Sequence, residues 1–122
     1  MNWLAVFLGG GLGSVLRYGI SLALLPHVRN FPVATLLSNT LATGLLAFFT
    51  VMASAKWLGP GSTWTLFLMV GFCGGFSTFS TFSMETIQLI KSGQTGIAIL
   101  NVLLNVVICL IVFFVVSRKV LS

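Results

Sequence analysis

Four long apolar segments, separated by short polar connections, organise the chain. They are Trp3–Leu25, Val33–Ala55, Trp64–Ile90 and Ile97–Ser117. A helix needs about 20 apolar residues to cross the hydrocarbon core of a bilayer, and each segment reaches that length. The pattern therefore predicts an all-α membrane protein in which residues 1–122 form a single transmembrane domain of four helices.

The composition supports this class. Hydrophobic residues make up 57% of the chain and charged residues 6%, and the mean hydropathy is +1.13. These values exclude an ordinary soluble domain. The net charge of +5 includes no basic run or basic face, so we expect no nucleic-acid partner. The cations lie mostly at segment ends, where they would meet lipid headgroups. The first segment is too long for the apolar core of a cleaved signal peptide and has no basic region ahead of it.

Catalytic and metal chemistry have few residues to draw on. The chain has one carboxylate, Glu85, and one histidine, His27, which lies in the connection after the first segment. These residues cannot form a transition-metal cluster. The chain also lacks a nucleophile–base–acid set. We therefore expect a protein that is not an enzyme, with His27 in solvent.

The third apolar segment carries the most informative pattern. After Gly71-Phe72-Cys73-Gly74-Gly75-Phe76 it repeats Ser-Thr-Phe from Ser77 onward. An α-helix has 3.6 residues per turn, so a repeat of three spreads its phenylalanines around the helix axis. Two adjacent glycines also disfavour a helix interior. We predict that the third helix is broken near its middle, between Gly74 and Ser77, where freed backbone groups must be buried in protein or line a polar cavity.

Polar side chains recur at helical spacing in two other segments. Thr35, Asn39 and Thr43 share one face of the second segment, and Asn101, Asn105 and Cys109 share one face of the fourth. An asparagine in a membrane interior is costly unless it is paired. Two interpretations remain open at this point, namely hydrogen bonds between helices and a polar track for an ion.

Three further features also allow two interpretations each. Arg17 either snorkels or pairs with backbone carbonyls or with Glu85. Glu85 either reaches the headgroup region or joins an internal polar pathway. The small-xxx-small pairs Gly9/Gly13 and Gly71/Gly75 either pack within one chain or form a contact between chains.

The positive charges give no orientation. Three lie at each side of the predicted membrane, with Lys56, Arg118 and Lys119 on one side and Arg17, Arg29 and Lys91 on the other. This balance is expected either if a partner or longer context decides the orientation, or if copies insert both ways and pair as antiparallel dimers.

The interior residues are suited to the passage of a small ion. Hydroxyl and amide groups can donate hydrogen bonds to an anion. The edge of a phenyl ring is the positive side of its quadrupole. Carbonyls freed at a helix break can coordinate a hard cation such as Na⁺. Ordinary packing is the alternative explanation for the phenylalanines.

The motif from Gly71 to Ser83 closely resembles the third-helix signature of the small bacterial fluoride channels, the Fluc or CrcB family. The resemblance covers the entire chain, since Gly9 to Gly13 with Arg17-Tyr18 is similar to the family's first-helix motif, and Asn39 with Gly44 is similar to its second. It implies a dual-topology antiparallel homodimer in the bacterial inner membrane. Such a dimer would have two fluoride pores and a central structural Na⁺.

The resemblance also implies roles for individual residues. The fluoride pore would be lined by Phe79, Phe82, Asn39, Ser80 and Thr81. A polar track would include Thr35, Glu85 and Asn105.

The backbone carbonyls of Gly74 and Ser77 would hold the Na⁺, although Ser77 replaces a threonine common in the family. Arg17 would be structural.

We therefore expect a channel that exports fluoride passively and relieves fluoride toxicity. One alternative is a small proton-coupled multidrug exporter, which needs a carboxylate deep in the first segment, where this chain has none. Another is a membrane assembly subunit that transports nothing.

Overall fold

The computed structural model describes residues 1–26 and 30–121. His27, which was predicted to lie in solvent, and Arg29, which was counted in the charge balance, are outside these ranges. The elements are α1 (Asn2–Leu24), α2 (Val33–Ser54), α3 (Thr63–Thr65), the π-helix η1 (Leu66–Cys73), α4 (Gly74–Phe76), α5 (Phe79–Lys91) and α6 (Thr95–Leu121).

The described part of the chain contains four helical spans that are long and apolar enough to cross a membrane. They are α1, α2, the composite third span Thr63–Lys91 and α6. The prediction of an all-α protein with four transmembrane helices is confirmed. The largest difference from the predicted ends is at α6, which continues to Leu121 and so passes Ser117.

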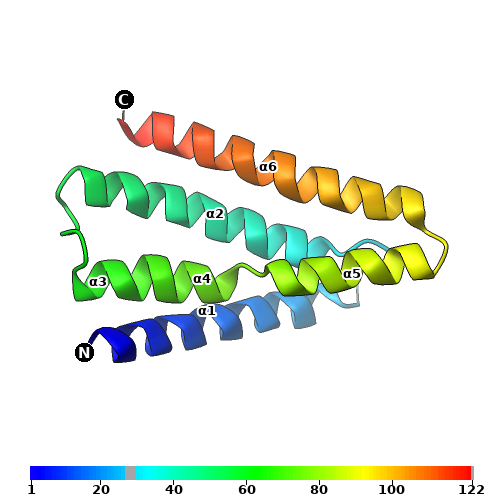
Figure 1. The fold of residues 1–122 in the computed structure, drawn as a ribbon, viewed down its shortest axis with the longest axis horizontal. Coiled ribbons are helices and arrows are strands. Elements are labelled where there is room, and N and C mark those ends of the chain that lie inside the picture. The colour runs from blue at the N-terminus through cyan, green and yellow to red at the C-terminus, as the bar shows by residue number, and fades with distance from the viewer. Residues whose placement is uncertain (27–29, 122) are drawn as a thin grey trace.

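The spans form two closely packed pairs (Figure 1). η1 and α4 pack on α1, while α2 packs on α6. α5, the last part of the third span, packs on α6 and not on α1. Both termini lie at the same end of the bundle, as four crossings require (Figure 1). The third span therefore changes its packing partner along its length, and the change falls at the break described below.

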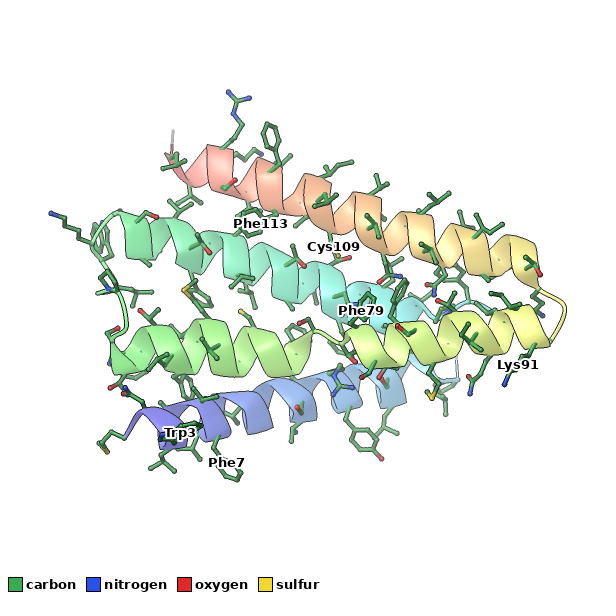
Figure 2. All side chains as sticks on the ribbon, in the orientation of Figure 1. Trp3, Phe7, Phe79, Lys91, Cys109 and Phe113 are labelled. Carbon is green, nitrogen blue, oxygen red and sulfur yellow. The ribbon has the colours of Figure 1, made fainter. Side chains whose placement is uncertain are left out.

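Most large apolar side chains point outward, and apart from Phe76, Phe82 and Val51 the buried residues are small or polar. Phe7, Leu110 and Phe114 are more than half exposed, whereas Ala98 and Asn101 are buried. Figure 2 shows apolar side chains projecting away from the bundle along α1 and α6. This distribution is the one expected for helices whose outer surface faces lipid.

Glycines bring α1 and the third span into backbone contact. A Cβ at Gly9 would overlap the Phe67 carbonyl, and one at Gly13 would overlap the Phe72 carbonyl. Gly75 faces the backbone of α1 in the same way. Small residues permit such close approach in lipid. The two small-xxx-small pairs thus pack against each other within one chain, which decides between the two interpretations.

The third span is broken at Ser77 and Thr78, whose backbones are extended (φ −80°, ψ 157° and φ −151°, ψ 120°). The predicted break is present, but its predicted position between Gly74 and Ser77 was wrong at the glycines. Gly74 and Gly75 are both helical. Gly75 serves close contact with the backbone of α1 and does not interrupt the helix. Helix resumes after Thr78, whose hydroxyl caps α5 by accepting the Thr81 amide at 3.2 Å.

Candidate functional site

Asn39 on α2 pairs with the extended peptide at the break. The Thr78 amide donates to Asn39 Oδ1 at 2.7 Å, and Asn39 Nδ2 donates back to the Thr78 carbonyl at 3.3 Å. The Asn39 side chain thus provides hydrogen bonds for both the N–H and the C=O of Thr78, which lie outside a helix. Without such a partner these groups would be costly to bury.

The break takes the helical donors away from the carbonyls of residues 74–77. In a continuous α-helix the amide of residue i+4 donates to the carbonyl of residue i. The Thr78 amide would serve Gly74, but it donates to Asn39. The Thr81 amide would serve Ser77, but it donates to the Thr78 hydroxyl. The carbonyls of Gly74 and Ser77 are therefore among the main-chain oxygens that the break makes available.

The first helix uses another of these carbonyls, that of Gly75. Gly75 accepts from Arg17 Nε at 3.3 Å and from Ser14 Oγ at 3.4 Å. Of the partners that the sequence left open for Arg17, the structure provides the backbone carbonyl. This contact ties α1 to the segment just before the break, as a structural role requires.

A pocket of about 240 Å³ lies beside the break. It is lined by Asn39, Thr43, Ser77, Thr78, Phe79, Phe82, Asn105, Val106 and Cys109. The Phe79 and Phe82 rings are tilted against each other, with centroids 5.6 Å apart. Phe82 is buried, but Phe79 is 79% exposed in the single chain. Figure 2 shows Phe79 where α5 begins. Phe79, Phe82 and Asn39, to which the resemblance assigns pore roles, thus meet at one pocket beside the break.

A chain of side-chain hydrogen bonds runs from this pocket through α6 to α5. Asn39 Nδ2 donates to Asn105 Oδ1 at 3.1 Å, and Asn105 Nδ2 donates to Asn101 Oδ1 at 2.9 Å. Asn101 Nδ2 donates to Thr86 Oγ1 at 3.0 Å. Asn101 and Asn105 are both buried. The two polar faces predicted for the second and fourth segments therefore do bond to each other.

Comparison with known proteins places the chain in a family. Residues 4–117 match the family described as CrcB-like protein, Camphor Resistance (CrcB). The chain belongs to the CrcB family. A protein of Saccharophagus degradans named fluoride-specific ion channel FluC is 47% identical over 107 residues, which are 87% of this chain and 79% of that protein. Proteins of the same name from Pyrococcus furiosus and Serratia proteamaculans are 46% and 42% identical. They cover 89% and 84% of this chain, and the matches span 87% and 80% of those proteins.

Thr35 on α2 and Glu85 on α5, which the resemblance assigns to a polar track, lie together farther from the break. Thr35 Oγ1 donates to Glu85 Oε1 at 2.8 Å. Glu85 Oε2 is buried, and it has no hydrogen-bond partner among the described residues. Glu85 also lines a second pocket, of about 550 Å³, at the end of the bundle where α1 ends and α2 begins. The pair therefore lies at the larger pocket and about one helical turn from the smaller one, because Thr35 is one turn before Asn39 and Glu85 is one turn after Phe82.

The structure does not bring Ser80 and Thr81 into the smaller pocket. Ser80 is exposed, and its hydroxyl lies 3.3 Å from that of Thr78. Thr81 accepts from the Thr78 hydroxyl at 3.1 Å. In the single chain both hydroxyls therefore lie near Thr78, which caps α5, and not beside the Phe79 and Phe82 rings.

Sequence reasoning missed three residues of this CrcB site. Thr78 was not singled out, although a threonine before a resumed helix is a recognised capping signal. Asn101 was noted for its spacing but given no role. Thr86 was not considered, and a threonine on an amphipathic helix gives no signal that separates it from its neighbours.

Proposed function

We propose that this CrcB-family protein is a fluoride-selective channel that exports fluoride passively, and that the ion passes the pocket beside the break. The relatives named fluoride-specific ion channels support the substrate. The observation that carries the local assignment is the meeting of Phe79, Phe82 and Asn39 at the break. The protein is a membrane channel and not an enzyme, since passive export needs a pathway and no chemical step.

Fluoride holds its hydration water tightly, so the pathway must replace that water at little cost and still release the ion. The phenyl ring edges of Phe79 and Phe82 present the positive side of their quadrupoles to the anion. The Ser80 and Thr81 hydroxyls, which lie around the cap of α5 and outside the pocket of the single chain, remain candidates for further donors along the pathway. Thr35, Glu85 and Asn105 continue the polar route toward the larger pocket.

A structural sodium ion is part of the proposal. Hard cations prefer oxygen ligands, and the Gly74 and Ser77 carbonyls have lost their helical donors. Their oxygens fit Na⁺ and would hold it. A bound cation supplies a fixed positive charge that favours an anion nearby.

Two carbonyls from one chain are fewer than the oxygens that a hard cation usually takes, so a second chain completes the set. The same partner covers Phe79, whose ring one chain leaves exposed. We assign this partner as an antiparallel copy inserted in the opposite orientation, in keeping with the balanced positive charges. The resulting homodimer has two pores.

The proposed location is the bacterial inner membrane, as a multi-pass protein surrounded by lipid. Fluoride that enters as HF dissociates in the cytoplasm, and the channel lets it leave down its gradient. This route relieves fluoride toxicity.

Purified protein in liposomes loaded with fluoride tests the function. A fluoride electrode should record rapid efflux once a potassium ionophore balances the charge, and a chloride electrode in a matched experiment should record little. Uptake of a cationic drug driven by protons would instead indicate a multidrug exporter. Absence of any flux from pure protein would indicate an assembly subunit.

A further inference from the structure

The hydrogens of the Asn39 amide are fully used inside the protein. A side-chain amide has two N–H donors and one carbonyl acceptor. The two donors of Asn39 go to Asn105 Oδ1 and the Thr78 carbonyl, and the acceptor takes the Thr78 amide. An asparagine that lines a pore is expected to donate to a passing anion, but here a donation to fluoride would first have to break one of these bonds.

The hydrogen-bond chain that holds Asn39 has a fixed direction, because a backbone group of known polarity lies at each end. At one end the Thr78 amide can only donate, so it requires Asn39 Oδ1. At the other end the Phe82 carbonyl can only accept, and it takes the Thr86 hydroxyl at 2.7 Å. Thr86 Oγ1 must then accept from Asn101 Nδ2.

The orientation of each amide between the two ends follows. Asn101 turns its Oδ1 to Asn105, and Asn105 turns its Oδ1 to Asn39. A second bond, from Asn105 Nδ2 to the Asn101 carbonyl at 2.9 Å, uses the remaining donor of Asn105. Asn101 is fully buried and Asn105 nearly so, hence water cannot easily replace these contacts.

We propose that Asn39 is a positioning residue that holds the third span broken, and that Thr86, Asn101 and Asn105 orient its amide. Asn39 keeps the Thr78 amide away from the Gly74 carbonyl and so keeps the pocket in shape. Thr86 thereby influences conduction although it does not line the pocket beside the break.

The test is removal of one hydroxyl at the far end of the chain. Thr86→Val keeps the shape of the side chain but removes the acceptor of Asn101 Nδ2. Thr50→Val is the matched control, because Thr50 Oγ1 donates to the Leu46 carbonyl at the same 2.7 Å but does not belong to the chain that holds Asn39. Thr86→Ser keeps a hydroxyl at this position and should therefore retain normal fluoride efflux.

Two quantities are measured on each purified variant. One is fluoride efflux from liposomes, and the other is hydrogen–deuterium exchange of the backbone amide of Thr78. Thr86→Val should reduce efflux by about tenfold, the effect of roughly one buried hydrogen bond. It should also speed exchange at Thr78. Thr50→Val and Thr86→Ser should match the unmodified protein in both measurements.

Unchanged efflux in Thr86→Val, or reduced efflux with unchanged exchange at Thr78, would overturn the inference. The efflux measurement rests on the proposed function, but the exchange measurement does not. If the unmodified protein carries no fluoride, the proposed function fails, and exchange at Thr78 alone still decides the role of Thr86.

Discussion

Gly13→Ala tests whether backbone contact between α1 and the third span supports the break. A Cβ at Gly13 would overlap the Phe72 carbonyl and lie 2.7 Å from the Phe76 amide nitrogen. Both atoms belong to the backbone, so no change of rotamer relieves the contact. Overpacking of this kind costs about 1–3 kcal/mol. Because the contact lies just before the break, we expect lower stability and lower fluoride efflux.

The matched control is Gly11→Ala on the same helix, where a new Cβ meets nothing within 4 Å. Both variants gain about 1 kcal/mol of helix propensity, so their difference isolates the overlap. Gly13→Ala should therefore be about 1–3 kcal/mol less stable than Gly11→Ala when denaturant is titrated in mixed detergent micelles. Equal stability of the two variants would refute the intramolecular contact as described.

The remaining predictions concern the pathway itself. Phe79→Ile and Phe82→Ile should each greatly reduce fluoride efflux from liposomes while the proposed dimer still assembles on a sizing column, because they remove the ring edges; normal efflux in both would reject the aromatic pathway. Replacement of Na⁺ by a large organic cation on both sides should reduce efflux, since such an ion does not fit the freed carbonyls; full activity without Na⁺ would count against the central ion. Thr35→Val removes the hydroxyl bonded to Glu85 and should reduce efflux and cost about 1–3 kcal/mol in the same micelle titration, whereas a variant that behaves like the unmodified protein would exclude Glu85 from the route.

The sequence predicted the four spans because their length and polarity depend only on local composition. It also predicted a break in the third span, but it placed the break at the glycines. Glycine weakens a helix in the same way whether it serves flexibility or close packing. The contact of Gly75 with α1 decides between the two, and that contact is a tertiary feature.

Several residues of the candidate site were predictable from the sequence, but the contacts that connect them were not. Spacing placed Asn39 and Asn105 on polar faces, yet it could not show that these faces bond to each other. Thr86 and Asn101 were given no role, because the spacing along one helix does not show which side chain a residue meets on the next helix. Arg17 had several open partners for the same reason.

The central claim is that fluoride itself crosses the membrane through this protein, and ionic current is its most direct measure. Purified protein in a planar bilayer is placed between solutions that differ in fluoride and contain equal chloride. The account predicts a current that reverses at the equilibrium potential of fluoride. Absence of current, or a reversal potential that does not change with the fluoride gradient, would contradict it.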